Sequence, residues 1–282
     1  MATLRFRIVN VFTQDQAALT GNPLCVFEDG HALDTAAMQA LARQFNLSET
    51  TFILPSTNAD ARVRIFTPNY ELPFAGHPTL GTAHVCRALR PGEDSLRLEM
   101  QAGLIHVVAQ QNRWTLTAPT PTWREFDLSR SVLAEALGLE ERDIDERPLW
   151  MKAGREQLVV PLTSLDAVRR AAPQAQSMQH IRSEDEIGMV YLCAPSAADT
   201  MLARFFFPQG AAILEDPATG SATANFGGWC LAMQRPLPIQ LEISQGEAVG
   251  RPSTLYLQVD ARGNIFVGGD VIEIAKGSVD IP

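Results

Sequence analysis

The sequence predicts an α+β protein made of two similar domains, and three observations support this prediction. The chain has 282 residues, enough for about two domains of ordinary size. Strand and helix patterns alternate along the first 118 residues, and the second half repeats landmarks of the first at a constant spacing. We therefore place an N-terminal domain at residues 1–118 and a C-terminal domain at residues 119–282.

The composition is that of an ordinary globular chain, with 46% hydrophobic and 20% charged residues. No stretch approaches the ~20 apolar residues of a membrane span. The formal net charge is −9, and no run of Lys and Arg opposes it, so nucleic acid and anionic membranes are not expected partners. The first ten residues have the pattern of an amphipathic strand and not of a secretory signal, which predicts a cytoplasmic protein.

The cysteine and glycine patterns point away from metal and nucleotide sites. The four cysteines lie among apolar residues without a CxxC pair, which favours buried free thiols. His77 and His84 lack a third ligand at a suitable spacing, so no metal is expected. The glycine-rich signatures of the usual nucleotide sites are missing as well. A small-molecule enzyme without a metal is the class that remains.

Each element of the first half has its own local signal. Asp34 should cap a helix through residue 45, since apolar side chains recur at helical spacing from Met38 onward. Alternating patterns predict strands at residues 50–54 and 62–67, and an all-round apolar pattern predicts a buried helix at 78–89. Strands at 95–100 and 104–109 form an expected hairpin, followed by a strand at 114–117. Residues 119–122 are expected to form a linker, and Gly268–Gly269 a turn between strands.

The second half repeats the first at an offset of 140 residues. In both copies a short aromatic strand ends at a proline, and a helix start follows about ten residues later. This order indicates an internal duplication, and two similar domains facing each other would enclose an active cleft. The identities that carry the offset are Pro55 and Pro195, Arg64 and Arg204, Phe66 and Phe206, Pro68 and Pro208, and Thr79 and Thr219.

The two repeated helix starts share a design that suits an anion. We expect His77 and Asp216 as N-caps, each followed by a proline at the first helical position. Small residues come next, so backbone N–H groups remain accessible to a carboxylate substrate. The alternative is that His77 and Asp216 are ordinary structural caps. The substrate-binding residues expected around these starts are Gly76, Thr79, Thr219, Gly220 and Ser221.

Glu49 is the third candidate for the chemistry. It lies at a helix-to-strand junction before an apolar strand, a placement that can aim a carboxylate into a cleft, although a solvated surface position is the alternative. Ser221, His77 and Asp216 could form a hydrolase triad. However, Ser221 follows Thr219 within a helix start and lacks the strand-to-helix elbow of a nucleophilic serine, so a hydrolase is the minor interpretation.

Taken together, these segments resemble the phenazine-biosynthesis PhzF-like isomerase family, which is built like diaminopimelate epimerase. The resemblance spans almost the whole chain and implies two domains, each a mostly antiparallel sheet rolled around a central helix. It also implies a homodimer, no cofactor and an active site in the cleft. The matching segments are residues 21–23, 46–52, 66–68, 71–73, 76–79, 215–222 and 250–253.

The resemblance also implies roles for the candidate residues. Glu49 matches the family's proton-shuttling carboxylate, and His77, Asp216 and Ser221 match polar residues that hold the substrate and assist proton movement. Gly76 and Gly220 would offer backbone N–H groups. The epimerase relatives use a cysteine at each helix start; here Ala75 or Gly76 and Asp216 stand at those places, which argues against a two-thiol racemase.

The function expected from these observations is isomerisation without a cofactor. Glu49 would move a proton, with a double-bond shift, on a small unsaturated or cyclic carboxylic acid. Two alternatives from other classes remain open at this stage. One is a non-catalytic protein that binds small carboxylates, and the other is a hydrolase that depends on Ser221. Exchange of substrate hydrogen would distinguish the first, and labelling of Ser221 by an acylating reagent would distinguish the second.

Overall fold

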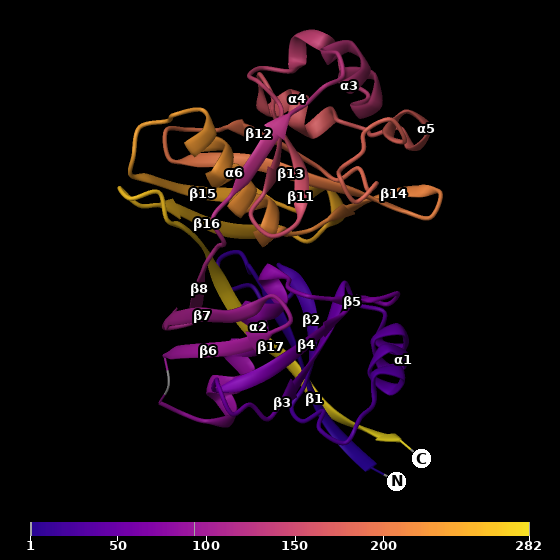
Figure 1. Cartoon of the computed structure of the whole chain (residues 1–282), viewed down its shortest axis with the longest axis vertical. Helices are drawn as coiled ribbons and strands as arrows, with labels where there is room; N and C mark the ends of the chain where they lie inside the picture. Colours follow the sequence, from indigo (N-terminus) through magenta and orange to yellow (C-terminus); the bar gives the residue numbers. More distant parts are fainter. Residues whose placement is uncertain (1, 93, 282) are drawn as a thin grey trace. The chain divides into compact units, whose positions relative to one another are not determined.

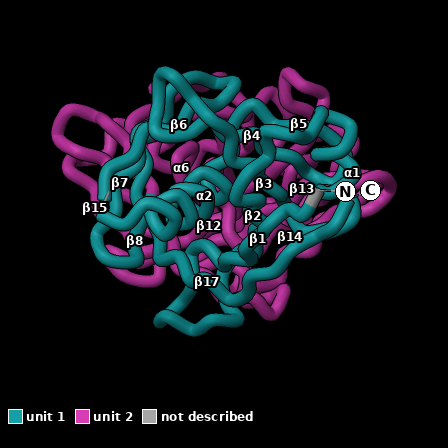
Figure 2. The backbone as a smooth tube through the Cα atoms, turned by 90° about the horizontal axis from the view of Figure 1, so that it is seen from below, with its two compact units in different colours: residues 1–117, 268–282 teal, residues 118–267 magenta. Residues whose placement is uncertain are grey.

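The computed structural model describes residues 2–92 and 94–281 of the chain. By backbone contacts the chain forms two compact units: unit 1 is Met1–Thr117 with Gly268–Pro282, and unit 2 is Ala118–Val267. Figure 2 colours them separately and shows the C-terminal segment with unit 1. The division into domains at residues 1–118 and 119–282 stays a prediction.

Unit 1 begins with a strand and alternates strands with two helices, as the sequence patterns predicted. Its elements are β1 (Ala2–Val11), β2 (Asn22–Phe27), α1 (Thr35–Phe45), β3 (Glu49–Leu54), β4 (Ala61–Phe66), β5 (Glu71–Leu72), α2 (Gly76–Leu89), β6 (Ser95–Met100), β7 (Gly103–Gln110) and β8 (Arg113–Thr117), and it is completed by the second part of β17 (Ile265–Ile281).

The strands of unit 1 close into a barrel around α2. The ring runs β1–β2–β3–β4–β6–β7–β8–β17 and returns to β1; β2–β3 and β4–β6 are parallel, and most of the other pairs are antiparallel. Figure 1 shows α2 among these strands and α1 outside them. The small residues at the start of α2 let the strands approach on every side, and the helix is buried from Gly76 to Ala83. The expected buried helix is confirmed, two residues longer at its N-terminus.

Helix α1 covers the outer face of the same barrel. Its N-cap is Asp34, which accepts a hydrogen bond from the Ala37 N–H, as predicted. Met38 and Leu41 pack on aromatic side chains that alternate outward from the strands, including Phe27 and Phe52, whose rings stack with centroids 4.9 Å apart. Strands of unit 1 are therefore buried on both faces, one against α2 and the other against α1.

Unit 2 repeats this plan with extra helices on its outer face. Strands β9, β10, β11, β12, β13, β15 and β16 pair in that order, and α6 packs against β9, β10, β11 and β16. Its elements are β9 (Thr122–Glu125), α3 (Arg130–Leu137), η1 (Glu141–Asp143), β10 (Leu149–Lys152), β11 (Glu156–Pro161), α4 (Leu165–Arg170), α5 (Ala175–Met178), β12 (Val190–Pro195), β13 (Thr200–Gln209), β14 (Ala212–Asp216), α6 (Gly220–Ala232), β15 (Ile239–Gln245), η2 (Glu247–Val249) and β16 (Ser253–Val259).

The internal repeat is confirmed by an arginine cluster that both units contain at the same strand. Arg64 on β4 forms two hydrogen bonds with the Glu71 carboxylate, at 2.7 and 2.6 Å, and its guanidinium lies 5.0 Å from the Phe66 ring centroid. Unit 2 builds the same cluster, with distances of 3.1, 2.6 and 4.7 Å, from Arg204, Glu215 and Phe206.

After this strand the offset changes from 140 to 144. Glu71 follows its cross-strand partner Phe66 by five positions, whereas Glu215 follows Phe206 by nine, because the second hairpin is longer. The helices start at Gly76 and Gly220 accordingly. The match of Thr79 with Thr219 is therefore wrong; the topological equivalent of Thr79 is Thr223.

The glycine pair near the C-terminus does not form the expected turn. Gly268 and Gly269 lie inside the long strand β17. A Cβ on Gly268 would lie 2.9 Å from the Trp114 carbonyl oxygen, and one on Gly269 would lie 2.2 Å from the Phe12 ring. The glycines are needed for close packing of a continuous strand and not for a reversal of the chain.

Candidate active site

In unit 1 the structure brings Glu49 and His77 together. Glu49 is the first residue of β3 and lies beside Leu24 of the parallel strand β2, while His77 is the second residue of α2. Glu49 Oε2 lies 3.2 Å from His77 Nε2, and both atoms are shielded from solvent. Two residues that are 28 positions apart in sequence thus form a single buried acid–base pair.

The environment of His77 determines its charge. Burial lowers the pKa of His77 to about 3, and a hydrogen bond to the Pro23 backbone opposes this shift only in part. Proline has no N–H, so its carbonyl accepts and an imidazole nitrogen donates. The ring is therefore neutral near pH 7, and the nitrogen that faces Glu49 can accept a proton from it.

Two buried threonines connect the strand that carries Glu49 with the helix that carries His77. The hydroxyl oxygens of Thr51 and Thr82 are 2.8 Å apart, and Thr82 also donates to the Pro78 carbonyl at 2.6 Å. These contacts link β3 to the first turn of α2. Neither threonine was singled out from the sequence, because β3 and α2 each contain other polar residues and no local signal distinguishes these two.

The N-cap assignments of His77 and Asp216 are wrong. The N-caps are Ala75 and Thr219, and neither of them makes a side-chain capping bond. Pro78 is the third helical residue, and Pro217 lies before the helix. The caps lie elsewhere because each helix begins at a glycine, Gly76 or Gly220. The first backbone N–H groups of both helices thus lack a side-chain cap, a feature that favours an anion there.

In unit 2 the turn that precedes α6 holds Asp216 in place through hydrogen bonds. Thr219 Oγ1 donates to Asp216 Oδ2 at 2.5 Å. The buried Gln245 side chain binds the same turn three times: it accepts from the Thr219 N–H at 3.2 Å, and it donates to the Asp216 carbonyl at 2.8 Å and to Thr219 Oγ1 at 3.0 Å. Gly246 has φ 81°, and a Cβ there would lie 2.4 Å from the Pro217 carbonyl oxygen, so this turn packs tightly.

Ser221 occupies the second position of α6, as His77 does in α2. Its hydroxyl oxygen accepts a hydrogen bond from Gln157 Nε2 at 2.9 Å. A serine hydroxyl can accept one hydrogen bond and donate another, so its own hydrogen remains available to a further group. This contact does not test the hydrolase interpretation, which stays an alternative.

The predicted site residues therefore form two groups, one in each unit. Unit 1 holds Gly76, His77 and Glu49 together; the Thr79 hydroxyl lies one turn further and donates to the Ala75 carbonyl at 2.7 Å. Unit 2 holds Asp216, Thr219, Gly220 and Ser221 in one continuous segment. Gln157, Asn225 and Gln245 were missed. Gln157 and Asn225 are polar residues in buried, mostly apolar elements, which is a usable signal, whereas Gln245 ends the half-exposed strand β15 and has no such signal.

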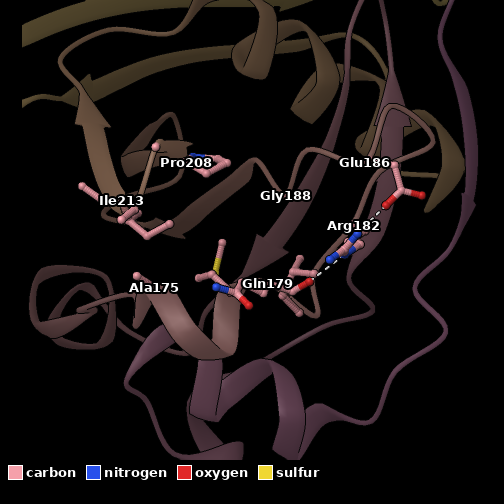
Figure 3. Close-up of a pocket in the computed structure, with 12 residues that line it drawn as sticks. Ala175, Gln179, Arg182, Glu186, Gly188, Pro208 and Ile213 are labelled. Carbon is pink, nitrogen blue, oxygen red and sulfur yellow. Dashed lines mark hydrogen bonds and ion pairs between the residues drawn. The ribbon is translucent and has the colours of Figure 1, made fainter.

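The structure also contains a pocket of about 180 Å³ in unit 2, away from these residues (Figure 3). Met178, Ile181 and Ile213 give it an apolar wall, and Arg182 donates to Glu186 at its edge at 2.6 Å. None of the predicted site residues lines it. Over the described residues, no group of His, Cys, Asp and Glu is arranged to hold a metal ion, and no helix is long and apolar enough to span a membrane.

Strands rolled around a buried helix in each unit, with polar side chains at the helix starts, are the architecture of epimerase-like isomerases. The PhzC-PhzF family of phenazine biosynthesis-like proteins matches residues 9–275, and the chain belongs to this family. An uncharacterized isomerase of Pasteurella multocida is 37% identical over 98% of this chain and 94% of its own length. The trans-2,3-dihydro-3-hydroxyanthranilate isomerase of Pseudomonas aeruginosa is 34% identical over 97% and 98% of the two chains.

A solved structure gives the same result for the fold. The PhzF-family phenazine biosynthesis protein of Bacillus anthracis superposes with a TM-score of 0.87 at 26% identity and covers 100% of both chains. The isomerase class and the sheet rolled around a central helix, both expected from the sequence, are confirmed.

Proposed function

We propose that this isomerase moves a proton between two carbons of a small unsaturated or cyclic carboxylic acid, with Glu49 as the general acid–base and without a cofactor. The observation that supports this most is the buried pair of Glu49 and His77. A partly exposed carboxylate held beside a neutral imidazole can take a proton from carbon, exchange it with water and return a proton to carbon.

The proposed reaction needs no external acid, base or oxidant. The Glu49 carboxylate removes a proton from a substrate carbon, and the electrons of that C–H bond form a new double bond as the existing one shifts. The protonated Glu49 then returns the proton to the carbon at the far end of the shifted system, so that substrate and product have the same formula. His77 accepts a hydrogen bond from the protonated carboxyl and keeps it oriented.

The remaining site residues are proposed to bind the substrate. Gly76 and Gly220 offer backbone N–H groups at uncapped helix starts, and Ser221 offers its hydroxyl to the substrate carboxylate. Asp216 is proposed to assist proton movement, and Thr79 and Thr219 to shape the site. A homodimer and a cytoplasmic location, both expected at the start, belong to the same proposal.

The test is exchange of substrate hydrogen in heavy water. The first compound is trans-2,3-dihydro-3-hydroxyanthranilate, for which the Pseudomonas aeruginosa relative is named; a panel of small unsaturated carboxylic acids follows. We expect product with deuterium on the newly protonated carbon, seen by NMR, for at least one compound. Turnover that requires an added metal or nicotinamide, or a panel without any isomerisation, would contradict the proposal.

A further inference from the structure

Unit 2 contains a buried network of side-chain amides that the fold itself does not require. It begins at Asn225, a fully buried residue in the middle of α6. Asn225 Oδ1 accepts from the Ala153 N–H at 2.6 Å, and Asn225 Nδ2 donates to the Arg155 carbonyl at 3.1 Å. A backbone N–H only donates and a backbone carbonyl only accepts, so these two contacts fix which end of the amide is oxygen.

The fixed orientation of Asn225 determines the orientation of Gln157. Asn225 Nδ2 also donates to Gln157 Oε1 at 2.8 Å, so the other end of the Gln157 amide must be its NH₂ group. That group donates to Ser221 Oγ at 2.9 Å. The Ser221 oxygen therefore accepts, and its own hydrogen is directed away from Gln157. The backbone of the turn between β10 and β11 thus determines, through two side chains, the orientation of one hydroxyl at the start of α6.

Unit 1 shows that the fold does not require this network. The topological equivalent of Gln157 is Pro23, which has no side-chain amide, because Leu24 and Leu158 are the residues that begin the parallel pairing with the next strand. The equivalent of Asn225, at the helix offset of 144, is Gly81. A Cβ on Gly81 would lie 2.6 Å from Leu24 Cδ2, so apolar packing fills this position in unit 1. The polar arrangement occurs only where a serine replaces His77.

We infer that Gln157 is a positioning residue which, held by Asn225, fixes Ser221 as a hydrogen-bond donor to the substrate carboxylate. The inference rests on the proposed function in one respect, that Ser221 meets a carboxylate. A serine free to rotate would spend part of its time with its hydrogen turned elsewhere, and a fixed one presents it continuously. Two neutral amides thereby prepare a site for an anion without adding a charge.

The decisive variant is Gln157→Glu, which keeps the oxygen that faces Asn225 and replaces only the NH₂ group. The new carboxylate accepts from Ser221 and turns its hydrogen inward. The probe is anthranilate, a stable aromatic carboxylate that cannot isomerise, and its affinity is measured by calorimetry. Gln157→Glu, Ser221→Ala and the double variant form a cycle with the wild type, which separates loss of the Ser221 contact from the effect of the added charge. Gln240→Glu, exposed on β15, is the matched control.

We expect Gln157→Glu to weaken anthranilate binding at least about tenfold, and the double variant to bind at least about fivefold more tightly than additive effects would give. If Gln157→Glu does not fold, the same cycle with Gln157→Met removes the donor without a charge, and the same departure from additivity is expected. Additive effects within about twofold, or no binding of anthranilate to the wild type at millimolar concentration, would overturn the inference. Because anthranilate does not react, these outcomes are independent of the deuterium test of the proposed function.

Discussion

Glu49 on β3 and His77 at the start of α2 form a buried pair whose facing atoms, Oε2 and Nε2, are 3.2 Å apart. The imidazole is neutral near pH 7 because burial depresses its pKa, so it can accept a hydrogen bond but adds no positive charge. A positive charge there would hold Glu49 permanently as an anion. A neutral partner instead lets the carboxyl both lose and carry a proton, as a proton shuttle requires.

The first prediction concerns Glu49→Gln. The amide keeps nearly the same volume and can still hydrogen-bond to His77, but it cannot accept and return a proton. We expect turnover to fall at least about 100-fold while substrate affinity changes by less than about tenfold. Thermal unfolding should stay close to that of the wild type. The measurement is the rate of deuterium incorporation into product in heavy water.

Glu135→Gln is the control for this variant, because Glu135 is exposed on α3. It should isomerise at the wild-type rate. Isomerisation by Glu49→Gln at close to that rate would refute Glu49 as the proton carrier, whatever else the site binds.

The second prediction follows from the depressed pKa of His77. The unfolded chain binds a proton at His77 below about pH 6.5, whereas the folded protein does so only near pH 3. Between these values the unfolded state holds more protons, so the free energy of unfolding must fall as the pH falls. Burial shifts the pKa of His84 in the same direction, to about 4, and adds to this loss.

We expect the His77 contribution to cost about 2 kcal/mol of stability between pH 7.5 and pH 5, measured by urea unfolding. His77→Gln removes that titration and should flatten the pH dependence, leaving the part that belongs to His84. His106→Gln, at an exposed position of β7, should keep the wild-type slope. An equal slope in His77→Gln and the wild type would mean that His77 is charged in the folded protein.

Sequence patterns predicted the parts of the fold that depend on local signals. The cap of α1 at Asp34 and the repeated strands of Arg64 and Arg204 were predicted correctly. Residues close together in the sequence determine caps and alternating strands, so a local pattern is enough to identify them. The patterns failed where a contact with a residue distant in sequence determines the local structure. Gly268 is a glycine because its strand packs closely against the Trp114 carbonyl, and the residues around Gly268 in the sequence do not show this contact.

The candidate site also combines features that local patterns predict with features that only distant contacts determine. Glu49 and His77 were each identified from their own surroundings, but only the closed barrel places them 3.2 Å apart. The caps were misassigned because a polar residue before a proline is a common N-cap signal, whereas here glycines begin the helices. Gln157 and Asn225 act through each other and are 68 positions apart, so neither shows a role in isolation.

The third prediction is that turnover does not depend on a thiol. All four cysteines are buried, and none lies at a helix start. Burial raises the pKa of Cys25 and Cys193 well above the ordinary value and that of Cys230 to about 12, so thiolates are scarce near neutral pH. Iodoacetamide at pH 7.5 should leave both the intact mass and the isomerisation rate unchanged. Inactivation that substrate prevents would instead indicate a cysteine in the site.

The last prediction concerns Gln245, which makes three hydrogen bonds to the turn that carries Asp216 and Thr219. Gln245→Leu fits the same space but leaves the Thr219 N–H and the Asp216 carbonyl without these partners in a buried setting. We expect a loss of about 1–3 kcal/mol in the free energy of unfolding. Gln240→Leu, exposed on the same strand, should lose almost nothing.

The activity of Gln245→Leu separates two roles of this turn. If the turn only supports the fold, the variant should turn over substrate normally at a temperature where it is fully folded. If the turn also aims Asp216 and the start of α6 at the substrate, as we propose, KM should rise severalfold under those conditions. An unchanged KM together with the expected loss of stability would restrict Gln245 to a structural role and would leave Ser221, held separately by Gln157, as the residue of this segment that the substrate meets.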